Sequence, residues 1–146
     1  MNPVPEEVLD YIKSQRVGVI AIEMLDGSPH AATVHYAHTE DPLMFCFETN
    51  RGYRKSEALL GRKTSRASFV IGFDEDHMKT LQFDGEVRLI EDGSEEALFE
   101  RIYMKKFPSK NVKSNDPDFL AFLFIPTWWR FTDWMRKGGK VILQST

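Results

Sequence analysis

The sequence predicts a mainly β fold in which six or seven antiparallel strands close into a barrel, with three short helices around it. Two observations lead to this fold class. Short segments of apolar, β-forming residues recur along the chain, and tight-turn signals such as Asp26-Gly27 and Glu40-Asp41-Pro42 join several of them. Closure into a barrel removes the exposed edges that so many short strands would otherwise present.

The amino-terminal part of the chain is expected to form a helix, three strands and a second helix. Val8, Tyr11 and Ile12 recur at helical spacing, which predicts the first helix. Gly61 ends the second helix. The elements expected here are helix Pro5–Gln15, strands Val17–Ile22, Pro29–Tyr36 and Leu43–Glu48, and helix Tyr53–Leu60.

The carboxyl-terminal part is expected to form strands around one longer helix. Gly85 marks a bulge or a bend in one strand, Ser94 is the expected cap of the helix, and Pro126 interrupts the last long strand. The expected elements are strands Ala67–Gly72 and Lys79–Ile90, helix Ser94–Lys106, a loop over Phe107–Asp118, strand Phe119–Trp134 and a short edge strand Lys140–Leu143.

Composition limits the classes of function. The 146 residues suit one domain, 1–146. A net charge of −3 argues against a nucleic-acid or membrane-surface partner, and no apolar run approaches the roughly 20 residues that span a bilayer. A lone cysteine, Cys46, cannot form an internal disulfide, and the amino terminus has no signal-peptide core. A cytoplasmic location is therefore expected.

Common catalytic motifs do not occur in the sequence. There is no G-x-S-x-G elbow, no Walker-type phosphate loop and no G-x-G-x-x-G after a strand. One cysteine and four scattered histidines match no zinc spacing, so no metal is predicted. His30, His35 and His38 are interpreted as polar positions on a strand, with a metal or haem ligand as the alternative. No catalytic residue is assigned.

The segment Thr49–Lys55 has a pattern that helix stability does not explain. Arg54 and Lys55 lie in the first turn of the expected helix, where cations oppose the helix dipole. A bound anion would reverse that effect, because free amides, the positive helix end and two cations together form a phosphate site. The alternative is that both side chains are solvated and pair with Glu57. Spacing alone leaves both interpretations open.

The sequence resembles the FMN-binding split barrels related to pyridoxamine 5′-phosphate oxidase, in the short form typical of general stress proteins. The most specific element is F-x-T-N-x-x-x-R-K, and the longer oxidases carry a final substrate-recognition segment that has no counterpart here. The other matching stretches are Val17–Ile22, DGSPHAATVHY (Asp26–Tyr36), PLMFCFETNRGYRKSEAL (Pro42–Leu59), TLQFDGEVRLIE (Thr80–Glu91), YMKKFP (Tyr103–Pro108) and IPTWWRFTDW (Ile125–Trp134). The resemblance implies a six-stranded antiparallel split β-barrel.

The resemblance also implies a flavin site. In the family a threonine lies near the flavin and an arginine-lysine pair binds the FMN phosphate, and these roles fall to Thr49, Arg54 and Lys55. A small hydroxyl residue usually precedes that pair; this chain has Tyr53, so the phosphate contact is expected to be either lost or replaced by Asn50. The remaining expected flavin contacts are Ala32, Thr33, Val34, and Thr80 or Gln82.

Family members bind FMN at a two-fold dimer interface, so a homodimer with a shared flavin site is expected. An aromatic residue from Trp128–Arg130 of the second chain would close the pocket, with Trp129 and Arg130 as the candidate residues. Neighbouring residues on a strand point to opposite faces, so one of Trp128 and Trp129 fills the barrel. Trp134 is expected to pack in the core.

The expected function is that of an FMN-binding flavoprotein, with oxidoreductase activity on an unidentified small molecule. The first alternative is a non-enzymatic module that binds or senses flavin, haem or a deazaflavin. The second is an empty barrel that serves as a dimeric scaffold, which the tyrosine at position 53 keeps open. A yellow protein supports the flavin, and a Soret band supports haem.

Overall fold

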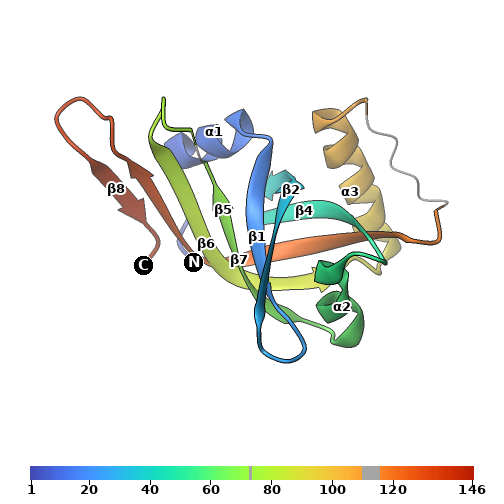
Figure 1. The fold of residues 1–146 in the computed structure, drawn as a ribbon. Coiled ribbons are helices and arrows are strands. Elements are labelled where there is room, and N and C mark those ends of the chain that lie inside the picture. The colour runs from blue at the N-terminus through green and yellow to red at the C-terminus, as the bar shows by residue number, and fades with distance from the viewer. Residues whose placement is uncertain (73, 110–115) are drawn as a thin grey trace.

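The computed structural model describes residues 1–72, 74–109 and 116–146, and these form three helices and eight strands (Figure 1). The predicted mainly β class and its three helices are confirmed. In chain order the elements are α1 (Glu6–Ser14), β1 (Val17–Glu23), β2 (Pro29–His35), β3 (Ala37–Glu40), β4 (Leu43–Asn50), α2 (Arg54–Gly61), β5 (Ser65–Ile71), β6 (Lys79–Leu89), α3 (Gly93–Lys106), β7 (Phe119–Asp133) and β8 (Val141–Gln144). Within these ranges, no helix is both long and apolar enough to cross a membrane.

The strands follow the path β2-β1-β5-β6-β7-β4-β3, and every pairing is antiparallel. The two strands at the ends of this path are separated in the chain by Tyr36 alone. Consequently β2 and β3 are two halves of one bent segment, and the path closes into a circuit of six strands, as predicted. The bend occurs where the Tyr36 hydroxyl donates to the carbonyl of Ile12 at 2.6 Å. The short strand β8 pairs with β7 outside the circuit.

Aromatic side chains fill the interior of the barrel. The Phe45 ring lies 5.1 Å from the Phe69 ring and 4.9 Å from the Phe83 ring, between centroids. All three side chains are buried. Offset and edge-to-face packing of this kind leaves no internal space for a planar ligand. A planar ligand such as the expected flavin would therefore have to bind on the outside of the barrel.

The helices cover only part of the outer surface (Figure 1). Helices α1 and α2 lie at opposite ends of the barrel, and both contribute to the main core. Helix α3 covers the outer side of β3, β4 and β7, where Phe99 and Tyr103 pack on Cys46 and Leu123 in a second cluster. No helix covers the outer face of β2, β1 and β5 among the described residues. That face is available to a ligand or to another chain.

Three predicted boundaries need correction. β4 continues through Asn50, because its last residues still pair with the start of β7. The predicted strand to Tyr36 continues past the bend as β3. The cap of α3 is Asp92, whose carboxylate accepts the backbone N–H of Ser94 at 2.7 Å, rather than Ser94 itself. In the predicted loop Phe107–Asp118, residues 110–115 lie outside the described residues.

Pro126 does not interrupt β7, which is continuous. The predicted bulge is present at Gly85, where the register of β6 and β7 shifts. A Cβ at Gly85 would lie 2.2 Å from the carbonyl oxygen of Ile125, so the close approach of the strands requires glycine. The extra residue in β7 is Thr127, whose hydroxyl donates to the carbonyl of Asp84 at 3.2 Å.

This bulge decides which tryptophan faces inward. Phe122 and Phe124 point into the barrel, and strict alternation from them would turn Trp128 inward. The extra residue reverses the alternation, so Trp129 is 1% exposed in the core and Trp128 lies on the outer face. The expectation that Trp134 packs in the core is wrong, because this residue lies just after the end of β7 and is 43% exposed.

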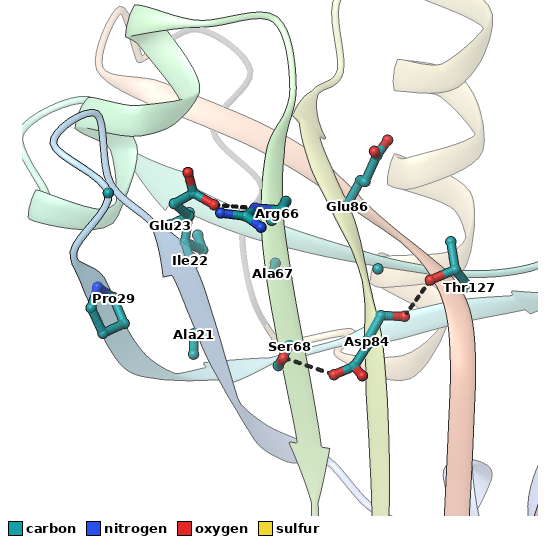
Figure 2. Close-up of a pocket in the computed structure, with 12 residues that line it drawn as sticks. Ala21, Ile22, Glu23, Pro29, Arg66, Ala67, Ser68, Asp84, Glu86 and Thr127 are labelled. Carbon is teal, nitrogen blue, oxygen red and sulfur yellow. Dashed lines mark hydrogen bonds and ion pairs between the residues drawn. The ribbon is translucent and has the colours of Figure 1, made fainter.

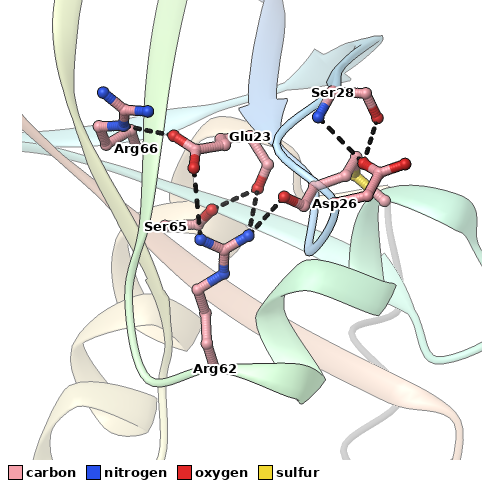
Figure 3. A network of polar contacts seen from close by, with 7 residues as sticks. Glu23, Asp26, Ser28, Arg62, Ser65 and Arg66 are labelled. Atoms are coloured by element: carbon pink, nitrogen blue, oxygen red, sulfur yellow. Dashed lines mark hydrogen bonds and ion pairs between the residues drawn. The ribbon is translucent and has the colours of Figure 1, made fainter.

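A polar network holds the β1–β2 hairpin against the end of α2 (Figure 3). The guanidinium of Arg62 donates to the backbone carbonyls of Glu23 and Met24. The Ser65 hydroxyl donates to the same Glu23 carbonyl, and the Glu23 carboxylate pairs with Arg66. Because these contacts join the end of β1 to Arg62, directly after α2, and to the start of β5, they fix the β1 side of the hairpin relative to the end of α2.

Candidate functional site

A pocket of about 280 Å³ lies outside the barrel, where β2, the end of β4, the start of α2 and one side of α3 meet. β4 and α2 follow each other in the chain, and the closed circuit of strands and the packing of α3 bring β2 and the distant helix α3 beside them. The residues that line the pocket are Thr33, Val34, His35, Glu48, Thr49, Asn50, Tyr53, Lys55 and Tyr103.

The junction between β4 and α2 is held by short-range hydrogen bonds. The Ser56 hydroxyl donates to the carbonyl of Asn50 at 2.7 Å and lies 3.2 Å from the Thr49 hydroxyl. The Asn50 side-chain oxygen accepts the N–H of Gly52 at 2.9 Å. Thr49 and Ser56 are buried. The start of α2 is thus in a defined position relative to the strand before it, as a preformed binding site requires.

Lys55 is a buried cation without an acidic partner. It is 8% exposed, and its Nζ lies 4.6 Å from the centroid of the Tyr53 ring. No described carboxylate forms an ion pair with it. Burial lowers the pKa of Lys55, because the charged form loses hydration. An anion in the pocket would supply the missing charge, and it would do so at the amino end of a helix.

The opposite wall of the pocket carries an acid and two rings. The Tyr103 hydroxyl interacts with the Glu48 carboxylate; burial and this carboxylate raise the pKa of Tyr103. The His35 ring packs edge-on against Phe107 at the end of α3, with 5.2 Å between centroids. A carboxylate on this side and a cation on the other give the pocket two chemically different ends.

Five predicted site residues line this pocket: Thr33, Val34, Thr49, Asn50 and Lys55. Ala32 is half-buried and pairs with Ile20 on the inner side of β2, outside the pocket lining. Arg54 lies beside the pocket with its side chain 59% exposed, and its guanidinium is 3.8 Å from the Glu57 carboxylate. Of the two cations, Arg54 therefore has the pairing with Glu57 that the solvated interpretation requires, and Lys55 does not.

The other predicted residues lie elsewhere in a single chain. Gln82 and Arg130 face each other across β6 and β7, and Thr80 is one step along on the same face. They lie on the same outer face as Thr33. Residues that pair directly on neighbouring strands form a row across the sheet, in the order Thr33, Val19, Val70, Gln82 and Arg130. Three strand spacings, about 14 Å, separate Thr33 from Gln82 along this row. The Trp129 ring is enclosed in the core; Trp128 is on the outer face, under the Arg130 guanidinium at 5.4 Å.

Sequence reasoning missed four residues at or beside the pocket: His35, Glu48, Ser56 and Tyr103. A signal existed for His35, which is two residues from Thr33 on the same face of β2. Ser56 directly follows the Arg-Lys pair and could have been noticed. Tyr103 had no local signal, because its place in the pocket depends on how α3 packs against β4.

A second buried cation lies near the pocket. The Lys106 Nζ has no hydrogen-bond partner and lies 3.8 Å from the centroid of the Tyr36 ring. Burial and the neighbouring Arg16 lower the pKa of Lys106 to about 8. The pKa of a lysine in the unfolded chain is about 10.4. Because the pKa of Lys106 is lower in the folded state, the charged amine destabilises the folded protein at pH values below about 10.

Replacing Lys106 with methionine is therefore expected to stabilise the protein at pH 7 by roughly 1–2 kcal/mol, allowing for partial exposure. The gain should shrink as pH rises from about 8 to 10, because wild-type Lys106 then becomes neutral when folded. Burial raises the pKa of Cys46 to about 12, so this residue makes the folded state less stable as pH rises. That effect is present in both proteins and does not contribute to the difference between them. Chemical denaturation at several pH values measures the difference. The exposed neighbour in Lys105→Met is the control, and a pH-independent difference would contradict the interpretation.

Among the described residues, no group of three or more histidine, cysteine, aspartate or glutamate side chains is arranged to hold a metal ion. His38, one of the candidate metal or haem ligands, belongs to no such group of described residues. Its side chain is largely buried, 3.8 Å from the Glu40 carboxylate, and burial lowers its pKa to about 4. It is a neutral core histidine at neutral pH.

Comparison with known proteins identifies similar sequences and folds. The family model described as pyridoxamine 5′-phosphate oxidase matches residues 4–133. No curated protein matches the chain. Similar solved structures include a general stress protein 26-related protein from Clostridium acetobutylicum (17% identity, 94% of this chain and 92% of that chain, TM-score 0.67). A pyridoxamine 5′-phosphate oxidase-related, FMN-binding protein from Nostoc punctiforme is similar at 16% identity (99% and 92%, TM-score 0.69). A haem-binding protein from Mycobacterium smegmatis matches at 18% (100% and 59%, TM-score 0.76).

Proposed function

The chain belongs to the pyridoxamine 5′-phosphate oxidase family, and from this premise we propose that it is a flavoprotein that binds FMN in the pocket between β2, β4, α2 and α3. The proposed activity is that of an oxidoreductase acting on a small molecule. Support for FMN comes from the family and from the chemistry of the pocket, which offers a cation at one end and a strand edge along one side.

The observation that carries the proposal is the environment of Lys55. Its side chain is largely buried, its amine pairs with no described carboxylate, and it lies at the amino end of a helix, an arrangement that a bound anion would stabilise. A phosphate ester pairs with such a cation and accepts from the backbone amides of the first helical turn. Thr49 and Ser56 supply hydroxyl groups at the same junction.

The remaining lining residues suit the rest of the cofactor. Thr33 and Val34 lie on β2, where the Thr33 side chain and the strand backbone form an edge for a planar ring, while the Val34 side chain packs in the core. FMN, when bound, supplies the hydride and electron transfer that protein side chains cannot perform. The role of this chain is to bind the phosphate, orient the ring and limit the access of water.

We further propose that the site is completed by a second copy of the chain. The pocket of one chain, about 280 Å³, falls below the roughly 300–1,000 Å³ usual for small-molecule sites. Gln82, Trp128 and Arg130 share the exposed outer face with Thr33. In a two-fold dimer formed through this face, these residues of one chain would approach the pocket of the other.

A groove on the outer face offers a place where another chain would approach, and Figure 2 shows the residues that line it. A groove of about 640 Å³ crosses β1, β5 and β6, and Ala21, Ser68 and Gly85 form part of its floor. Charged side chains of both signs surround the floor, including Arg66 and Glu86. Small residues permit close contact between sheets, and mixed charge permits a self-complementary interface.

The direct test is the ligand that the purified protein carries or takes up. A protein that binds FMN should be yellow, or should acquire flavin absorption bands on titration with FMN. Mass spectrometry of the released ligand then identifies it. A Soret band without flavin bands would replace the proposal with haem binding, as in the similar haem-binding protein. Failure to take up either ligand would leave the empty scaffold as the better hypothesis.

A further inference from the structure

Tyr53 occupies a position that local structure does not explain. It is the N-cap residue of α2, yet its side chain accepts no hydrogen bond from the helix. Serine, threonine, aspartate and asparagine are the usual caps, because their side-chain oxygens bind the free amides. Tyr53 instead contributes only backbone groups: its N–H donates to Asn50 and its carbonyl accepts from Ser56, both at 3.0 Å.

The Tyr53 ring lies at the mouth of the pocket. It lines the pocket and is still 57% exposed, so one side of the ring faces solvent while Lys55 lies over the ring. The contact with Lys55 covers only part of the surface of the Tyr53 ring. The exposed area of a large aromatic side chain beside a binding pocket is typical of a stacking surface for a planar group.

Further cations lie next to this ring. Arg54 is mostly exposed, and its pair with Glu57 at 3.8 Å is long and solvated. Arg51 is exposed, and its side chain forms no ion pair or hydrogen bond with another described residue. Outside the pocket an exposed aromatic ring is therefore accompanied in the chain by two guanidinium groups, and Arg54 would exchange its solvated contact with Glu57 for a phosphate. This is the chemistry that binds a nucleotide: the base stacks and the phosphate pairs.

We propose that the flavin site extends beyond the first phosphate and takes the adenylate half of flavin adenine dinucleotide (FAD). The adenine stacks on Tyr53, and the second phosphate pairs with Arg54 and Arg51. This inference rests on the proposed function, because Lys55 binds the first phosphate in both FMN and FAD. It differs from that function in the residues beyond Lys55, which distinguish the two flavins.

Isothermal titration calorimetry with FMN, FAD and AMP tests the inference on three proteins: the parent, Tyr53→Ser and Tyr53→Phe. The parent should bind FAD at least as tightly as FMN. Tyr53→Ser should lower the affinity for FAD relative to that for FMN by roughly 5- to 150-fold, the range for loss of one base–aromatic stack, because any change at the first phosphate affects both flavins equally. Tyr53→Phe keeps the ring and should bind both flavins as the parent does.

Other outcomes separate this inference from the proposed function. Tenfold or greater preference of the parent for FMN would overturn the FAD assignment and leave FMN binding intact. Equal losses of FMN and FAD in Tyr53→Ser would also overturn it, because the ring would then act on the half that the two flavins share. Tight binding of AMP alone, without flavin, would assign the ring to a free nucleotide. If the parent binds neither flavin, the proposed function itself fails and the inference fails with it.

Discussion

Replacing Lys55 with alanine is expected to weaken FMN binding by about 10- to 150-fold and to leave riboflavin binding unchanged. The loss of a charge-assisted contact costs roughly 1.5–3 kcal/mol, and burial places Lys55 toward the upper part of that range. Riboflavin lacks the phosphate, so it should bind weakly to the parent, and its affinity should not change with the substitution. Flavin fluorescence or calorimetric titration measures both affinities.

Arg54→Ala should have a smaller effect on FMN than Lys55→Ala. Its guanidinium is 59% exposed and already close to Glu57, so solvent and the carboxylate screen its charge. Lys63→Ala is the matched control, because Lys63 is an exposed lysine in a groove on the other side of α2. Equal losses of FMN and riboflavin in Lys55→Ala would show that Lys55 acts on the ring and that no phosphate site exists there.

The folding of Lys55→Ala provides a separate check. A largely buried lysine without an acidic partner destabilises the unliganded protein, so its removal should leave the melting temperature unchanged or raise it. A lowered melting temperature would mean that the lysine has a structural role. The rise in melting temperature on addition of FMN should be smaller in the variant, because weaker binding stabilises the folded state less.

Local patterns predicted most of the fold. Alternating apolar segments and turn residues located each long strand, and Gly85 identified the bulge. The errors came from long-range pairing. Asn50 remains in β4 because β7 lies beside it, and Tyr36 ends β2 because its hydroxyl binds the Ile12 carbonyl. Neither partner is visible from the local sequence.

The same distinction holds for the candidate site. Thr49, Asn50 and Lys55 are close in the sequence, and cations that oppose the helix dipole mark this segment from the sequence alone. The contrast between Lys55 and Arg54 cannot be predicted in that way, because two adjacent residues on a helix differ in burial according to what packs beside them. Likewise, which tryptophan points outward depends on one extra residue in β7, and alternation alone assigns it incorrectly.

Subunit mixing is expected to restore an FMN site from two defective chains. If the site is shared, a Lys55→Ala chain lacks the phosphate contact, and a Gln82→Ala/Arg130→Ala chain lacks part of the wall that it gives to its partner. Each homodimer should bind FMN at least about tenfold more weakly than the parent. A heterodimer contains one site with both defects and one site with neither. It should therefore bind one FMN with parental affinity.

Co-expression of the two chains with different affinity tags, followed by purification on both tags, isolates the heterodimer for titration. The control is the same experiment with Lys55→Ala on both tagged chains, which should restore no tight site. Absence of a tight site in the heterodimer would place all binding residues within one chain. Parental affinity of the Gln82→Ala/Arg130→Ala homodimer would remove these residues from the site. A monomer that binds FMN stoichiometrically would refute the shared site altogether, because one chain would then supply every residue that the flavin needs.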